Sequence, residues 1–159
     1  MGQAADPASD FDFLIGSWRV RHRRLARRLS GCTDWVEFSG SSTERPILGG
    51  RGNVEENRID LPGDPYTGVA LRAFDRKTGN WAIHWLDSRE PSRMDPPLIG
   101  RFENGIGTFH AEDQFEGRPI RVRFIWSQAD ARSCRWEQAF SADGGASWET
   151  NWTMEFSRL

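Results

Sequence analysis

The sequence predicts an all-β fold, an antiparallel up-and-down barrel of about nine or ten strands that follows a short N-terminal helix or turn. Short runs alternate apolar and polar side chains, which is the period of a strand with one buried face. Turn residues such as Gly, Asn and Asp separate these runs at regular intervals, and long connections are nearly absent. The length of 159 residues fits one domain, 1–159, in which residues 1–10 form a flexible lead.

The first apolar segment, residues 11–18, contains Gly16 and predicts the short helix or turn. From Trp18 to Arg23, arginines alternate with Trp, Val and His, so a first strand with a solvated arginine face begins there. Only residues 21–29 also fit a helical period. The further strands that the pattern predicts are 35–43, 53–61, 69–74, 81–87, 98–103, 106–113, 119–127, 133–141 and 148–157.

Two connections are especially clear. Residues 75–80 contain Asp, Thr, Gly and Asn, which favour a hairpin turn between the strands on either side. Residues 90–97 contain three prolines and therefore form a loop, because proline cannot donate to a sheet ladder.

Composition excludes several function classes. The net charge of −2 gives no overall attraction to nucleic acid or to an anionic membrane, so neither is an expected partner. No apolar run is long enough to span a bilayer, and residues 1–10 lack the segments of a secretory signal, which favours the cytoplasm. In that reducing compartment we expect Cys32 and Cys134 to be free thiols.

Gly16-Ser17-Trp18 at the head of the first strand resembles the G-x-W element of lipocalins. Together with the turn at 47–50, the hairpin at 71–81 and the segment 141–152, it resembles uncharacterised bacterial lipocalin-like proteins of the calycin superfamily, from about residue 11 to residue 158. The resemblance implies a barrel with an interior cavity. It also implies that Trp18 packs at the closed end against a basic residue of a late strand, either Arg123 or Arg158.

Two motifs favour structural interpretations. Residues 141–148 match the Asp-box of sialidase propellers, but the chain has one such box and no blade-length repeat, so we expect a hairpin turn. The basic run 19–28 would need interleaved aromatic residues on an open sheet face to bind RNA, and we interpret it as a solvated face.

The histidines His22, His84 and His110 are isolated in the sequence and show no metal-ligand spacing, so no metal and no cofactor are expected. Haem needs only one axial His, for which His84 and His110 are the candidates.

The strongest constellation is aromatic. The chain has eight Trp and ten Phe, and an indole offers a large apolar face with an N–H that can meet a ligand. Side-chain alternation puts three stripes on the inward face: 120, 122, 124 and 126; 134, 136, 138 and 140; and 148, 150, 152, 154 and 156. We expect a small hydrophobic or aromatic ligand, although Trp and Phe could instead fill the barrel. The expected ligand-binding residues are Arg72, His84, Trp85, Arg101, Trp126, Trp136, Gln138 and Trp152.

Two alternatives remain open. One is an isomerase, cyclase or hydrolase of a small metabolite, with an inward acid such as Glu37 or Glu137 and a helper such as His84 or Arg101, because burial would raise the pKa of that acid. Glu112 and Asp113 are further carboxylates that could serve. The other is a structural protein that forms a homodimer through an exposed apolar patch.

Overall fold

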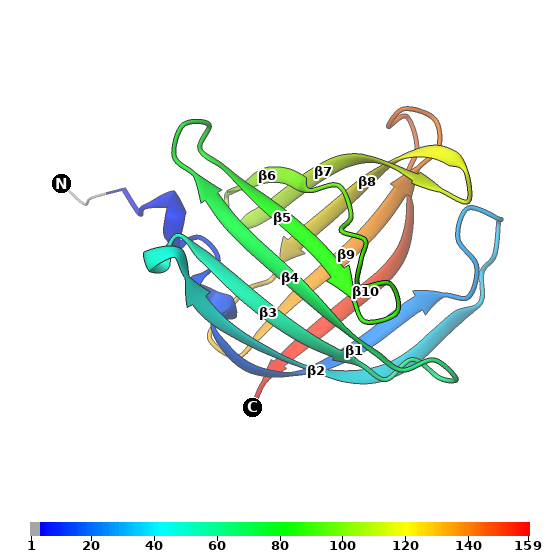
Figure 1. Cartoon of the computed structure of the whole chain (residues 1–159), viewed down its shortest axis with the longest axis horizontal. Helices are drawn as coiled ribbons and strands as arrows, with labels where there is room; N and C mark the ends of the chain where they lie inside the picture. The colour runs from blue at the N-terminus through cyan, green and yellow to red at the C-terminus, as the bar shows by residue number, and fades with distance from the viewer. Residues whose placement is uncertain (1–3) are drawn as a thin grey trace.

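Ten antiparallel strands close into a barrel in the structure, a computed structural model that describes residues 4–159 (Figure 1). Each strand pairs with its neighbours in sequence, and β1 also pairs with β10, which closes the sheet. The predicted all-β up-and-down barrel is therefore confirmed. The strands are β1 Gly16–Leu25, β2 Trp35–Ile47, β3 Gly52–Ile59, β4 Tyr66–Asp75, β5 Asn80–Asp87, β6 Leu98–Glu103, β7 Ile106–Phe115, β8 Arg118–Ser127, β9 Ser133–Ser141 and β10 Glu149–Arg158.

The alternation seen in the sequence locates every strand. β6 and β9 have the predicted bounds, and the largest shift of a single strand end is in β2, which continues four residues beyond the predicted end to Ile47. The helical alternative for residues 21–29 is wrong, since β1 runs to Leu25 with Arg19, Arg21 and Arg23 exposed and Val20 and His22 buried.

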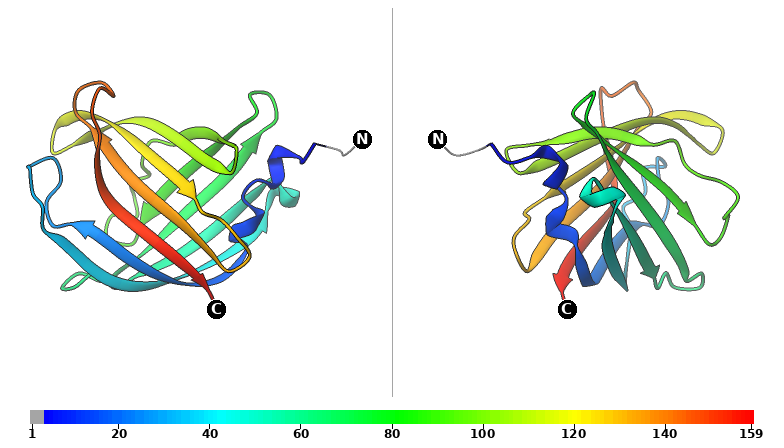
Figure 2. Two further views of the ribbon diagram at one scale, coloured as in Figure 1. Left: turned by 180° about the vertical axis from the view of Figure 1, so that it is seen from behind. Right: turned by 60° about the vertical axis from the view of Figure 1, so that its left-hand side comes forward.

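A short N-terminal segment covers one end of the barrel (Figure 2). It consists of the 3₁₀ turns η1 Pro7–Ser9 and η2 Asp12–Leu14. Phe11 between them is buried, with its ring centroid 5.0 Å from that of Trp81, and the Trp81 indole donates a hydrogen bond to the Pro7 carbonyl (3.1 Å). The expected flexible lead spans residues 1–10; residues 1–3 lie outside the described part, whereas Pro7–Ser9 pack on the barrel.

Trp18 completes this closed end. Its side chain is fully buried, its Nε1 donates to the Leu14 carbonyl (2.7 Å), and the Arg158 guanidinium lies 4.1 Å from the ring centroid. Arg158 also donates to the carbonyls of Ile15 (2.7 Å) and Phe13 (2.9 Å). Of the two expected partners, Arg158 is thus the one that meets Trp18. Gly16 permits the approach, because it has a φ of +123° and a Cβ there would lie 2.5 Å from Arg158 Nη1.

The segment 141–148 forms the turn between β9 and β10. The Asp143 carboxylate accepts a hydrogen bond from the Ser147 amide (2.9 Å), and the Ser141 hydroxyl accepts one from the Gly145 amide (2.8 Å). Hydrogen bonds from Ser147 lower the pKa of Asp143 to about 2. The Asp-box is therefore a hairpin device, as the sequence predicted.

Candidate functional site

A cavity of about 400 Å³ lies inside the barrel, and its lining includes residues at the strand ends opposite the N-terminal segment, among them Arg24, Tyr66 and Phe115. It opens between the connections at that end, which include the β1–β2 and β5–β6 loops. Its volume is in the range of about 300–1,000 Å³ that small-molecule sites occupy.

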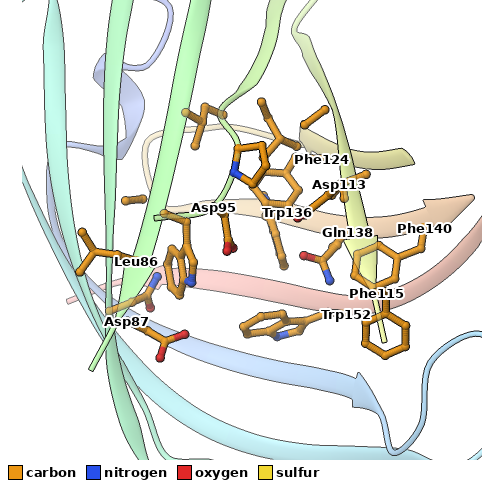
Figure 3. A pocket seen from close by; sticks show the side chains of 18 of the residues that line it. Leu86, Asp87, Asp95, Asp113, Phe115, Phe124, Trp136, Gln138, Phe140 and Trp152 are labelled. Atoms are coloured by element: carbon orange, nitrogen blue, oxygen red, sulfur yellow. The ribbon is translucent and has the colours of Figure 1, made fainter. Parts of the chain in front are cut away.

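Aromatic rings form the wall of this cavity (Figure 3). The ring of Trp136 meets that of Trp152 edge to face at 5.4 Å between centroids, and meets Phe124 at 4.9 Å. The other aromatic lining residues are Tyr66, Trp85, Phe115, Trp126 and Phe140. The wall therefore offers a ligand aromatic faces and edges from several strands.

Gly68 gives Trp85 its place in this wall. A Cβ added to Gly68 in β4 would lie 2.2 Å from Cη2 of Trp85 in β5. The indole therefore lies directly on the Gly68 backbone. Any residue other than glycine at position 68 would place its Cβ in the space that the indole occupies.

A β-bulge in β10 corrects one predicted stripe. Thr150 pairs with Ala139, but the next pair is Trp152 with Gln138, so Asn151 is the extra residue. Because one extra residue reverses the facing of the chain, Trp152 and Met154 line the cavity whereas Trp148 and Thr150 do not. Trp148 instead packs beneath the Arg123 guanidinium, 4.4 Å from its ring centroid.

A buried polar cluster forms the floor of the cavity. The Arg72 guanidinium makes ion pairs with Glu44 and Glu55 and donates to Asn53 Oδ1 (2.9 Å). Glu55 also accepts hydrogen bonds from Ser42 (2.9 Å) and from the Asn57 amide. Arg72, Glu55 and Asn57 border the cavity, so its base is polar while its wall is aromatic.

Burial and neighbouring charges shift the pKa values of Glu44 and Arg72 in this cluster. Burial, together with the charge of Glu55, raises the pKa of Glu44 well above its ordinary value. Burial alone would lower the pKa of Arg72, but the Glu55 and Glu44 carboxylates raise it.

His22 supports the aromatic wall from behind. It is fully buried, stacks on Phe38 at 4.8 Å between ring centroids, and accepts at Nδ1 a hydrogen bond from Trp152 Nε1 (3.1 Å). Burial lowers the pKa of His22 to about 4, so the ring is neutral at pH 7 and can accept that hydrogen bond.

Most of the residues expected at the site surround the cavity. These are Arg72, Trp85, Trp126, Trp136, Gln138 and Trp152. His84 and Arg101 do not line it: His84 alternates with the inward Ile83 and Trp85, and the exposed Arg101 donates to Asn80 Oδ1 (2.9 Å). Strand alternation therefore removes these two from the interior.

The expected inward acids Glu37 and Glu137 are also on the outer face. Glu37 lies near Arg21 (3.6 Å) and Arg23 (3.7 Å), and Glu137 pairs with Arg135 (3.4 Å). Asp113 does border the cavity, whereas Glu112 pairs outside with Arg121.

The acids that face inward, Glu44 and Glu55, escaped the sequence analysis. Strand alternation could have indicated that both side chains point inward. Glu44 is on the same face of β2 as the buried Phe38, and Glu55 is on the same face of β3 as the buried Ile59.

Other predicted features have clear positions. His110 lies on the outer face against Trp148 (5.8 Å between ring centroids), and since His84 also faces outward, neither haem candidate reaches the cavity. Within residues 4–159, no three His, Cys, Asp or Glu side chains gather as a metal site would require. No helix in that range has the length and apolar character to cross a membrane. Cys134 is a buried free thiol, and burial raises its pKa to about 12; Cys32 is also free.

Comparison with known proteins identifies a family. No curated protein matches the chain. Residues 10–158 match the model of DUF1579, a family described as protein of unknown function. Because this match spans the whole barrel, the chain belongs to the DUF1579 family.

Proposed function

We propose that this protein binds a small hydrophobic or aromatic molecule inside its barrel. The observation that carries the proposal is the cavity of about 400 Å³, which has aromatic walls and opens at one end. Tryptophan and phenylalanine side chains that served only as a core would interdigitate and leave little space, because protein interiors are close-packed. The polar floor gives a bound molecule a second kind of contact.

The proposal includes a lipocalin-like relationship. It is supported by the closed meander and by the contact of Trp18 with Arg158, the contact that the resemblance implied. We also propose a cytoplasmic location, in which the free thiols of Cys32 and Cys134 would persist.

A fluorescent apolar probe, N-phenyl-1-naphthylamine, tests the binding proposal. We expect it to bind with a blue-shifted emission and to quench tryptophan fluorescence. Ala111→Phe adds a ring inside the cavity, so it should abolish binding. Ala82→Phe adds the same ring on the outward face of β5 and should leave binding unchanged. No probe binding to the parent, or full binding to Ala111→Phe with a folded circular dichroism spectrum, overturns the proposal.

The polar floor supports a second candidate, an isomerase, cyclase or hydrolase of a small metabolite. Buried carboxylates beside a cavity, with one pKa strongly raised, are typical of acid–base sites as well as of structural ion pairs. NMR titration of the glutamate side chains, with Glu44→Gln for assignment, tests this rationale. A solvent-like pKa for Glu44 removes it.

A further inference from the structure

We propose that the ligand carries an acid group, and that Arg24, Arg28 and Tyr66 hold this group at the mouth of the cavity while its apolar part lies against the aromatic wall. The inference rests on the proposed function and names its ligand class: an aromatic or aliphatic organic acid.

These three residues meet at the cavity although Tyr66 lies far from the two arginines in the sequence. Arg24 belongs to the end of β1, Arg28 to the β1–β2 loop and Tyr66 to the start of β4, and all three line the cavity. The Arg24 guanidinium is 5.0 Å from the ring centroid of Trp152, and that of Arg28 is 5.1 Å from the ring centroid of Phe115. The positive charges therefore border the aromatic wall directly.

The polar groups of this trio lack partners outside the trio. Within the described chain, Arg24 Nη1, Arg28 Nε and the Tyr66 hydroxyl are buried with no carboxylate, carbonyl or amide partner, although Arg24 and the Tyr66 hydroxyl interact with each other, and Tyr66 as a whole is only 6% exposed. Other arginines of the mouth are neutralised, since Arg89 pairs with Asp87 (3.1 Å) and Arg93 lies near Glu90 (3.9 Å). A buried donor without an acceptor is costly, so an oxyanion at this point would satisfy three donors together.

The electrostatics of the mouth favour an anion here. Burial and the charge of Arg24 lower the pKa of Arg28 to about 10, and burial likewise lowers the pKa of Arg24, so both remain charged at pH 7 while repelling each other. Burial raises the pKa of Tyr66, against the opposing effect of Arg24, which keeps its hydroxyl a donor.

Carboxylates elsewhere on the cavity limit where an acid group can lie. Asp95 and Asp113 also border it, and burial together with the charge of Asp113 raises the pKa of Asp95. Asp87 and Glu116 act on Arg24 and Arg28 only from a distance, because neither forms an ion pair with them. An acid group is therefore repelled beside Asp95 and attracted beside the two unpaired arginines.

Two probes that differ by one acid group test the inference: 8-anilinonaphthalene-1-sulfonate and its uncharged parent, N-phenyl-1-naphthylamine. Arg24→Met with Arg28→Met keeps much of each side-chain stem and removes both charges. We expect the dissociation constant of the sulfonate to rise about tenfold or more, the value of one charge-assisted hydrogen bond, and that of the neutral probe to change less than about twofold. Arg27→Met removes the same charge from an exposed residue of the same loop and should change neither constant.

The outcomes separate the two proposals. If the neutral probe binds but the double variant does not weaken the sulfonate selectively, or if Arg27→Met weakens it equally, the acid-group inference fails and the proposed function stands. If neither probe binds the parent, both fail. Should the double variant not fold, Tyr66→Phe removes only a hydroxyl, and an unchanged sulfonate affinity in that variant overturns the inference.

Discussion

Trp18 and Trp152 are both interior tryptophans, yet the structure gives them different roles. Trp18 is enclosed on all sides at the closed end, whereas one side of the Trp152 ring faces the cavity. We expect Trp18→Ala to lower the free energy of unfolding by about 3–5 kcal/mol, as other large core truncations do, and Trp152→Ala to lower it less. Probe affinity should show the reverse order. Urea denaturation and probe titration measure both, and a Trp18→Ala protein as stable as the parent would contradict the plug.

His22 makes the stability of the barrel depend on pH. Burial lowers its pKa from 6.5 to about 4, so between these values the unfolded chain binds a proton that the folded chain does not. Stability from this residue is therefore complete above pH 6.5 and is lost as the pH falls toward 4, by on the order of 3 kcal/mol. Urea denaturation at pH 7 and pH 4 should show a smaller loss for His22→Gln than for the parent. Equal losses would mean that His22 does not titrate in this range.

The facing of a single residue could be predicted where its side-chain type and its place in the strand alternation indicate the same face of the sheet. Trp136 and Trp152 followed from both, and so did the outward arginines of β1. Glu44 and Glu55 did not, because charged residues are almost never fully buried without partners, and Arg72 is a partner that lies far away in the sequence. Only the folded sheet brings the three together.

At the level of strands, alternation was sufficient until the ladder became irregular. The stripes of β8 and β9 face inward as predicted, and all their members except the buried Cys134 line the cavity. The predicted inward stripe of β10 was wrong at Trp148 and Thr150. The bulge at Asn151 arises from how β10 pairs with β9, and the residue types of the segment do not indicate it.

The contact between β4 and β5 at Gly68 leads to a prediction about the cavity wall. In Gly68→Ala the new methyl group would overlap the Trp85 ring, so the indole must move. We expect weaker binding of N-phenyl-1-naphthylamine, by about tenfold, and a moderate loss of stability of about 1–3 kcal/mol from overpacking. Gly117→Ala, in an exposed turn with a φ of +75° and open space around it, is the control for binding, because it costs backbone strain without touching the cavity wall. Unaltered probe binding in Gly68→Ala would show that the Trp85 position is irrelevant to the ligand.

For the whole molecule, the proposed ligand binding links affinity to folding stability. A ligand that binds only the closed barrel at about 100 times its dissociation constant stabilises it by about 2.7 kcal/mol. For a chain of this length we therefore expect the melting temperature to rise by several degrees, measured by calorimetry. The cavity-filled Ala111→Phe variant should show no such rise with the same ligand.

The homodimer hypothesis also belongs to this scale and stays a prediction. Among the exposed large apolar residues of the described chain, Ile99 and Ile106 lie on the paired strands β6 and β7. Light scattering should report twice the monomer mass, and Ile99→Glu should return it to the monomer value. A monomer in the parent would remove the hypothesis.

Among the described residues, Phe11, Leu14 and Trp18 are buried together at one end, and the cavity opens at the other end, so the barrel has the shape of a cup and not of a tube. We therefore expect a ligand that enters this cavity to leave by the same route, past Arg28 and the β5–β6 loop. We expect the residues at the mouth to control the rates of ligand entry and release. The depth of the cavity limits the length of the ligand. Substitutions in the loops at the mouth should therefore change the residence time of the ligand and leave its affinity nearly unchanged.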